Sequence, residues 1–550
     1  MPKRILSIVI VIFAFTFAGC HTKEQPNSPA LPSLHLTMTS IQLDSILADH
    51  DNKVSPFAVL IGTDGDTLFE GDLTYIKTRG NTSLKEQKKS YTIKFPQKYT
   101  LFGLEKNRSF VLLANACDES HIRNAIGLDL ARAFGIPASH YAYLTLYING
   151  SYKGLYQMTN KIDVGKRTLD ITNLDDLNKL ANPKPLKEYA WYGYGRKKQV
   201  ILRKGVLLDR NPDNITGGYL LDNTGANFFY SKSISGFASD AGDHIQIRSP
   251  KYASPQEVNY IASLYNEMEK AIHSPEGVHP ETGKHYSEYI DVESFARYYL
   301  LNELLYNHDG GWASFMMYKD TDSINPKIYA GPAWDYDRTL DNPRFQQRNL
   351  MITNELYVNE RKGQIGLAHS GGLLYHLCKH ADFQQAVKTA YINQVSPACH
   401  GYLAENSIDS LFLYLHQEAD HDHALLGNRF SADYETATTS AKDFLKKRIE
   451  FFDWYFSSNE RVHATYRDKY GRTRNFYFPI GENIHAPQIE KLYNRTPVYE
   501  LYYAGTNSIV PDGTVFHASQ ELELRKRPAT KHEVQMRRIQ KKLAKFGIKI

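Results

Sequence analysis

The segment from Asn307 to Asp337 most constrains how this chain can fold, because it combines a short hairpin with acidic residues near both outer ends. The apolar runs FMMY and KIYAG are separated by TDSINP, whose Asp, Ser, Asn and Pro favour a turn. A hairpin would bring its outer ends together, so Asp309 and Asp335 are predicted to face one site. Paired carboxylates suit a divalent cation and a phosphoryl-transfer centre, although acidic residues at strand ends are often simply solvated.

Residues 1–19 are predicted to be a signal peptide. Two basic residues precede an uncharged apolar run that is too short and wrongly flanked for a membrane span. Cys20 follows a glycine, as at a bacterial lipoprotein cleavage site, and would become the lipidated first residue of the mature protein. The alternatives are an ordinary signal peptide with an incidental Cys, or an uncleaved anchor. The polar residues 20–33 are expected to form a tether.

The composition is that of a globular protein with a large core. The chain has 550 residues, of which 42% are hydrophobic and 23% charged, enough for more than one domain. Basic residues gather in 525–550, a tail that is predicted to be partly helical and that either touches a polyanion such as anionic lipid or is solvated. No base-reading motif accompanies it, so nucleic-acid binding is not expected.

Hydrophobic patterns divide the chain into strand-rich and helix-rich parts. Short apolar runs predict strands over 34–114, and Asn149-Gly150 predicts a hairpin turn. After 458 the texture changes to aromatic-rich strands, which predicts a boundary there and a β-rich segment over 458–524. Single helices are expected over 121–133, 255–273 and 292–306. The long region 370–457 is expected to be mostly helical.

A lysine is predicted on the inner face of the strand that begins near residue 89. Strand alternation places Lys89 on the same face as Tyr91, Ile93 and Phe95, and these apolar neighbours indicate that the face is buried. A buried lysine needs an anionic partner. That partner is either a nucleotide phosphate or a structural carboxylate.

The motif HQEADHDH places three potential metal ligands, His416, Asp420 and His423, at near-helical spacing. This spacing permits a metal site, but it is also typical of a solvated helix end.

Several blocks, in this order, resemble the CotH kinase family, a group of atypical protein-kinase-like proteins. The resemblance is closest to lipoprotein members from Bacteroidetes-type bacteria and covers most of the chain from about Leu34 to Tyr455. The blocks are KTRGNTSLKEQKKSYTIKF, FVLLANACDESHIRNAIGLDLA, LYINGSYKGLYQMTNKIDVGKR, GGYLLD, DVESFARYYLLNELLYNHDG and KIYAGPAWDYD.

The resemblance implies an α+β, atypical protein-kinase-like fold of two lobes over 34–457. The N-lobe is expected to be β-rich and the C-lobe mostly helical, with a small β-rich C-terminal extension. ATP and Mg²⁺ or Mn²⁺ would bind between the lobes.

The resemblance also implies roles for individual acids. Asp309 matches the catalytic aspartate that orients or deprotonates the acceptor hydroxyl, and Asp335 matches the aspartate that binds the metal. Asp337 is expected to assist the metal or to cap the turn. Ser314 stands where the family often has a metal-binding Asn, and a hydroxyl is a weaker ligand than an amide oxygen.

The cations of the implied site lie in the N-terminal half. Lys89 is assigned to the phosphates, and Arg79 and Arg123 are expected to make further phosphate or structural contacts. Asn160 stands where the family hairpin usually ends with Glu. A neutral Asn cannot hold Lys89 as a carboxylate would, which raises the chance of a weak enzyme.

The function implied is phosphate transfer from ATP to Ser or Thr of an envelope or secreted protein. The protein itself would be lipid-anchored through Cys20 in the bacterial cell envelope, at the outer membrane. Because ATP is scarce outside the cytoplasm, a catalytically weak or inactive surface module that binds a peptide or glycan is the alternative. A third possibility is a glycan-handling enzyme that uses the acidic pair without metal.

Overall fold

The computed structural model describes residues 30–544, except 81, 166–168, 183–187, 190–199, 203–204, 207–209, 225–234, 308, 312, 347–350, 359–371, 428–429, 431, 469–472 and 490–496. The expected signal peptide, Cys20 and most of the expected tether therefore lie outside the described residues. No helix in the described part of the chain is both long enough and apolar enough to cross a membrane.

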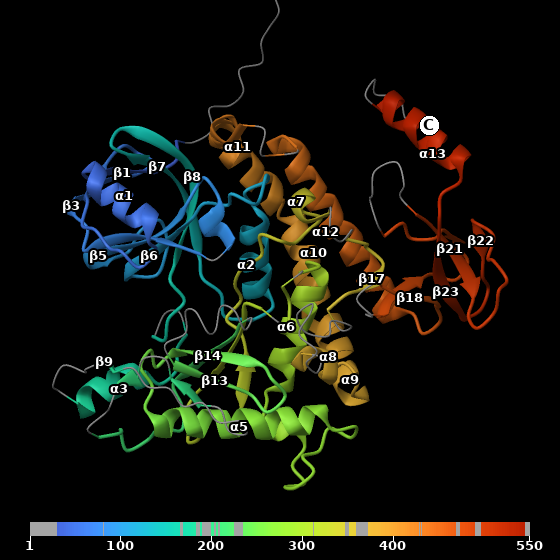
Figure 1. Ribbon diagram of the computed structural model, residues 1–550, viewed down its shortest axis with the longest axis horizontal. Helices are drawn as coiled ribbons and strands as arrows, with labels where there is room; N and C mark the ends of the chain where they lie inside the picture. The colour runs from blue at the N-terminus through green and yellow to red at the C-terminus, as the bar shows by residue number, and fades with distance from the viewer. Residues whose placement is uncertain are drawn as a thin grey trace, which may run out of the picture.

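The N-terminal lobe is a curled eight-stranded sheet with strand order β3-β2-β1-β7-β8-β6-β5-β4 (Figure 1). Its central hairpin, β7 to β8, turns at Asn149 and Gly150, which both have positive φ. The buried side chains of the strands form a core of their own. The elements are β1 (Ser33–Thr37), α1 (Ser40–Ala48), β2 (Phe57–Ile61), β3 (Thr67–Asp72), β4 (Tyr75–Arg79), a 3₁₀ turn (Thr82–Lys85), β5 (Ser90–Tyr99), β6 (Asn107–Leu113), α2 (Arg123–Ala133), β7 (Tyr141–Ile148) and β8 (Ser151–Asn160).

A second sheet of six strands, in the order β10-β13-β14-β12-β15-β16, forms the base of the other lobe. The expected hairpin is confirmed, because β15 and β16 pair antiparallel with Met317 opposite Ala330. Helix α5 packs against β10 and β13 (Figure 1). The elements are α3 (Leu174–Ala181), β9 (Glu188–Tyr189), β10 (Val200–Leu202), β11 (Gly205–Val206), β12 (Tyr219–Asn223), β13 (Ser235–Ala238), β14 (His244–Ser249), α5 (Pro255–His273), a 3₁₀ turn (Tyr286–Glu288), α6 (Val292–Leu304), β15 (Phe315–Lys319) and β16 (Ile328–Ala330).

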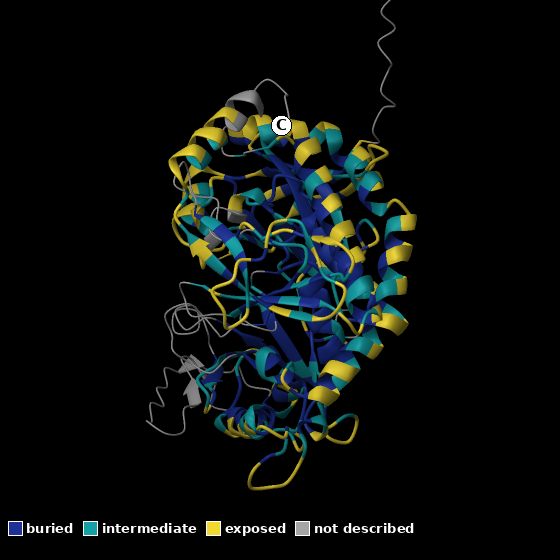
Figure 2. Ribbon diagram, turned by 90° about the vertical axis from the view of Figure 1, so that its right-hand side faces the viewer, coloured by how far each residue is buried: buried dark blue, intermediate teal, exposed yellow. Residues whose placement is uncertain are grey.

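Helices fill the rest of this lobe, and one of them reaches back to the N-terminal sheet. Helix α11 packs against β8. Figure 2 shows buried residues along the sheets and the inner sides of these helices, with exposed residues outside. The elements are α7 (Pro343–Gln346), α8 (Leu373–Leu377), α9 (Ala381–Ala390), a π-helical turn (Tyr391–Val395), α10 (Ser396–Ala404), α11 (Ser407–Leu426) and α12 (Tyr434–Ser457).

The C-terminal segment forms a five-stranded sheet, in the order β17-β19-β18-β23-β21, that recruits a strand from the preceding lobe. Strand β17 pairs with β19, with Glu355 opposite Phe476 and Leu356 opposite Asn475. The sheet has its own apolar core. The elements are β17 (Glu355–Leu356), β18 (Val462–Arg467), β19 (Thr473–Phe478), β20 (Asn483–Ile484), β21 (Val498–Tyr503), β22 (Thr514–Val515), β23 (Gln520–Arg527) and α13 (Lys531–Ala544).

The architecture is thus α+β with two lobes, as expected, in a kinase-like arrangement. The predicted helices at 121–133, 255–273 and 292–306 are confirmed by α2, α5 and α6. The six-stranded sheet is an addition, because the second lobe was expected to be mostly helical.

Candidate active site

Three carboxylates gather between the end of α6 and the loop after β16. Asp309 lies in the loop after α6, and its Oδ2 is 3.5 Å from Nη1 of Arg338. Burial raises the pKa of Asp335, and the nearby charge of Asp309 raises it further. The hairpin therefore brings the two predicted acids to one site, as its antiparallel pairing requires.

Asp335 is held in an uncommon conformation. Its φ is +73°, in the left-handed region that non-glycine residues seldom adopt. Ser314, which also has a positive φ of 51°, donates a hydrogen bond of 3.0 Å from Oγ to Oδ2 of Asp335. Ser314 therefore lies beside the expected metal ligand, and its hydroxyl orients that carboxylate.

Asp337 is the third acid of the group. Its burial, followed by the neighbouring charge of Asp335, raises its pKa well above the usual value. The charge of Arg338 opposes these shifts and partly offsets the repulsion between the two carboxylates. Among the described residues, only Asp49, His50 and Asp51 bring three potential ligand atoms within 4.8 Å of one another. Asp309, Asp335 and Asp337 do not meet this criterion, so a metal held by them would need further ligands, such as phosphate oxygens.

Helix α2 fixes the loop that carries Asp335 and Asp337. Asn124 accepts a hydrogen bond of 2.7 Å from the backbone N–H of Tyr336. The Tyr336 ring lies so close to α2 that a Cβ at Gly127 would be 2.3 Å from it. Only glycine permits this approach of helix and loop.

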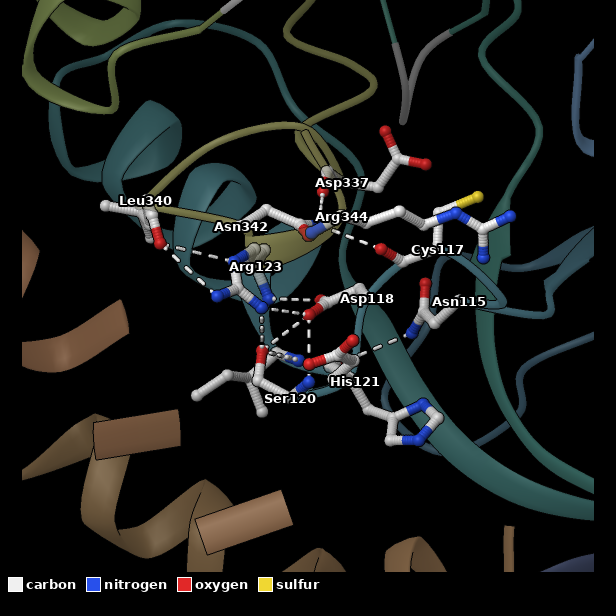
Figure 3. A network of polar contacts seen from close by, with 12 residues as sticks. Asn115, Cys117, Asp118, Ser120, His121, Arg123, Asp337, Leu340, Asn342 and Arg344 are labelled. Carbon is white, nitrogen blue, oxygen red and sulfur yellow. Dashed lines mark hydrogen bonds and ion pairs between the residues drawn. The ribbon is translucent and has the colours of Figure 1, made fainter. Parts of the chain in front are cut away.

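Arg123 makes structural contacts, which is one of the two roles expected for it. Its Nη1 donates to Asp118 at 2.5 Å, and its Nε donates to the backbone oxygen of Thr339 at 3.0 Å. Figure 3 shows the guanidinium enclosed by Asp118, Ser120 and Leu340. Arg123 therefore ties the start of α2 to the chain just after Asp337, and its side chain is fully buried there.

A pocket lies between the N-terminal sheet, α2 and the acidic loop. Cys117 lines it beside Asp337, and burial raises the pKa of this thiol to about 12, so it is protonated at neutral pH. The lining residues are Ser83, Ser90, Leu113, Ala114, Asn115, Ala116, Cys117, Asn124, Leu128, Trp334, Asp335 and Asp337.

Arg79 is a predicted phosphate contact that lies near the acidic group. Its guanidinium lies over the Trp334 ring at 5.2 Å from the centroid. Burial and the charge of Arg248 lower its pKa to about 10, against the opposing effect of Asp335. Its Nη1 is buried and has no hydrogen-bond partner in the described part of the chain. A buried donor without an acceptor is costly, so this nitrogen fits an anionic ligand.

Lys89 does not lie where the buried-face prediction put it. Strand β5 begins only at Ser90, and the Lys89 ammonium donates to the backbone oxygens of Leu84 and Glu86 at 2.5 and 2.6 Å. These two carbonyls belong to the turn before the strand, so the turn holds the side chain.

The buried lysine is Lys88, which sequence reasoning missed. Its Nζ is 2.7 Å from Oδ1 of Asp422 on α11, and both side chains are almost fully buried. Asp422 lies inside the HQEADHDH motif, so this acidic motif was the sequence signal for a carboxylate partner of the buried lysine. Of the three residues predicted as metal ligands, His416 and Asp420 lie 3.4 Å apart, whereas His423 hydrogen-bonds to the backbone oxygen of Glu119.

Asn160 serves the N-terminal sheet. Its side chain is fully buried and exchanges two hydrogen bonds with the backbone of Glu105, at 3.1 and 2.9 Å. An ionised glutamate could accept the first bond but could not donate the second. Asn160 therefore fixes the loop of Glu105, whereas the Lys89 ammonium hydrogen-bonds to Leu84 and Glu86.

Comparison with known proteins matches one family. Residues 76–452 match the family model described as CotH kinase protein, and a search of curated proteins finds no match. The matched residues span most of the chain and include the acids of the site. The chain therefore belongs to the CotH kinase family.

Proposed function

We propose that this protein is a Mg²⁺-dependent kinase that transfers the γ-phosphate of ATP to Ser or Thr side chains of an envelope or secreted protein. The observation that carries the proposal is the gathering of Asp309, Asp335 and Asp337 beside the unpartnered, buried nitrogen of Arg79. Clustered carboxylates and a free guanidinium are the complementary groups that a metal–nucleotide complex needs.

Asp309 has the position of the acceptor-orienting group. Its carboxylate is partly exposed, with 14% of the side-chain surface accessible, and Arg338 holds it from one side. An acceptor hydroxyl can therefore reach it, donate a hydrogen bond and lose its proton to it as the phosphoryl group transfers.

Asp335 and Asp337 are the residues that would hold the divalent ion. When bound, Mg²⁺ supplies positive charge that neutralises the phosphate oxygens. Ser314 keeps the Asp335 carboxylate oriented through its hydrogen bond. Arg79 donates to a phosphate oxygen from the opposite lobe, and the Trp334 ring holds its guanidinium plane.

The proposed location is the bacterial cell envelope, with the chain anchored by lipid on Cys20. This part of the proposal rests on residues 1–20 of the sequence. A Cys20→Ser variant should lose label from radioactive palmitate and leave the membrane fraction. Retention of both label and membrane association by this variant would contradict it.

The decisive experiment measures Mg–ATP binding and phosphate incorporation by the purified mature chain. The test variant is Asp335→Asn, which removes the expected metal ligand and keeps the shape of the side chain. Asp213→Asn is the matched control, because Asp213 is exposed and pairs only at the surface with Arg210. Calorimetric titration with ATP, with and without Mg²⁺ or Mn²⁺, gives the binding, and radioactive ATP gives the transfer.

Metal-dependent binding and incorporation that Asp335→Asn abolishes and Asp213→Asn preserves are the expected results. Binding without incorporation would favour a kinase-like surface module, to which Ser314 in place of an amide ligand would contribute. The absence of nucleotide binding with either metal would contradict the kinase proposal.

A further inference from the structure

A buried charged group joins the C-terminal sheet to the end of α6. Arg474 on β19 donates from Nε to Oε1 of Glu355 at 2.7 Å and from Nη2 to Oε2 at 2.5 Å. The same Nη2 donates to the hydroxyl of Tyr306 at 3.2 Å, and this hydroxyl donates to Glu355 at 2.5 Å. Only 9% of the Arg474 side chain and 1% of the Glu355 side chain are exposed. The three side chains thus satisfy one another away from water.

Tyr306 connects this group to the loop of Asp309. Its φ of +51° is a left-handed conformation that turns the chain out of α6, and such a conformation costs about 1 kcal/mol or more in a bulky residue. Its ring stacks on Tyr357 at 4.5 Å, and its hydroxyl is held by Arg474 and Glu355. The surrounding contacts therefore offset the strain of this turn.

Asn307 connects the end of α6 to Asp309 through its side chain. The Asn307 side chain donates to Oδ1 of Asn302 at 2.8 Å, and its own Oδ1 accepts from the backbone N–H of Asp309 at 3.0 Å. The backbone conformation of Tyr306 thereby influences the position of the Asp309 backbone.

A second buried arginine fastens the segment that carries Glu355. Arg448 on α12 donates to the backbone oxygens of Thr353, Glu355 and Glu303 at 2.7, 2.6 and 2.5 Å. The Glu303 carboxylate in turn accepts the backbone N–H groups of Tyr357 and Val358 at 2.9 and 2.7 Å. The segment of Glu355 is therefore held against α6. Arg474 is the residue of β19 that binds the Glu355 carboxylate.

We propose that the C-terminal sheet is a working part of the catalytic lobe and that Arg474 is a positioning residue for Asp309, acting through Tyr306. Arg474 lies beyond residue 452, where the match to the family ends. The expected effect on kcat rests on the proposed kinase function. The expected effect on the position of Asp309 rests on the contacts described above.

The test compares Tyr306→Phe and Arg474→Gln with two matched controls in the full mature chain. Tyr306→Phe keeps the ring and removes only the hydroxyl. Its control is Tyr286→Phe, which removes a partly buried hydroxyl that donates to Asp382 at 2.7 Å. The control for Arg474→Gln is Arg527→Gln, which removes a guanidinium that pairs with Glu500 and Glu533 at the far side of the same sheet.

Two readouts are measured on each variant. Hydrogen exchange followed by mass spectrometry reports the mobility of the peptide 305–311, and phosphorylation of dephosphorylated casein gives kcat and the KM for ATP. Both test variants should exchange faster in this peptide and lose on the order of tenfold to 100-fold in kcat, since a small displacement of a reacting group has that effect. The KM for ATP should stay within about twofold, because the nucleotide-binding residues do not change.

The controls should match the wild type in both readouts. A folded Tyr306→Phe variant with normal exchange in 305–311 and normal kcat would overturn the proposal, as would a kcat loss that only follows global unfolding. If Arg474→Gln does not fold, Tyr306→Phe decides alone. If the wild type shows no phosphate transfer, the proposed function fails, while the exchange of peptide 305–311 still tests the positioning role.

Discussion

Arg79 ends β4 with a buried guanidinium whose Nη1 lacks a hydrogen-bond partner among the described residues. Replacing it with Gln should weaken Mg–ATP binding about 10- to 100-fold, because a hydrogen bond to a charged group contributes about 1.5–3 kcal/mol. Lys77→Gln on the same strand is the control, since Lys77 pairs with the exposed Asp51. Isothermal titration would give both affinities, and equal affinities would remove Arg79 from the site.

Glu257 predicts a pH dependence of stability that is separate from the active site. Burial raises the pKa of this carboxyl to about 7, so the folded protein favours its protonated form. Stability is then lost as pH rises from the unfolded value of about 4.3 through 7. Glu257→Gln should raise the free energy of unfolding by about 1–3 kcal/mol at pH 8 and change it little at pH 4. Denaturant titrations at the two pH values provide the measurement, and a gain of equal size at both would contradict this origin.

Individual site residues were predictable only where a local pattern placed them. Asp309 and Asp335 flank a hairpin, whose turn chemistry alone indicates that they meet. The choice between Lys88 and Lys89 depends on where β5 begins, and a shift of one residue exchanges the two faces of a strand. The 3₁₀ turn before β5, which accepts hydrogen bonds from Lys89, has no strong sequence signature.

At the scale of elements, the contact between α2 and the loop of Asp335 depends on Gly127. A Cβ there would lie 2.3 Å from the Tyr336 ring. Gly127→Ala should therefore displace the loop, lower stability by about 1–3 kcal/mol and reduce Mg–ATP binding. Gly401→Ala in α10 is the control, because its Cβ would meet nothing within 4 Å. There, the helix propensity of Ala should add about 0.5–1 kcal/mol. Thermal unfolding with and without Mg–ATP would show the contrast, and similar behaviour of the two variants would contradict the close-contact argument.

Elements with local start and stop signals were predicted well. Helix α5 begins after Ser254, which forms a capping box with Glu257 and precedes a proline in the first turn. The strands of the six-stranded sheet were harder to predict, since β12 pairs with β15, far along the chain. Such pairing depends on long-range packing, to which strand propensity is a weak guide.

At the scale of the whole molecule, Lys88 and Asp422 connect the two lobes. The carboxylate of Asp422 also accepts the backbone N–H of Leu155 in β8 at 2.9 Å. Burial lowers the pKa of the adjacent His121 to about 4, so this ring is neutral at pH 7. Burial also lowers the pKa of Lys88, and the charge of Asp422 opposes that change. The pair thus fastens α11 to the N-terminal sheet.

Asp422→Asn should lower the free energy of unfolding by about 3–5 kcal/mol, because it leaves the buried Lys88 without its counter-charge. Asp420→Asn, two residues away and more than half exposed, is the control and should change stability by less than about 0.5 kcal/mol. Chemical denaturation of both variants measures the difference. A small effect of Asp422→Asn would show that the lobes do not depend on this pair.

The arrangement of the lobes could be predicted only through the family resemblance. Contacts such as Lys88 with Asp422, or β17 with β19, join residues far apart in the chain, and no local pattern in either partner specifies the other. The aromatic texture after 458 indicated a separate sheet, but it could not show that β17 would belong to that sheet as well.

The position of β17 in the C-terminal sheet has a practical consequence for the design of truncated proteins. A fragment that stops at Ser457, the end of α12, contains the whole region that matches the family. It would nevertheless expose the edge of β17 and leave the buried Glu355 carboxylate without the guanidinium that neutralises it. Such a fragment should express poorly or aggregate. The smallest fragment that we expect to fold stably therefore includes the C-terminal sheet through β23.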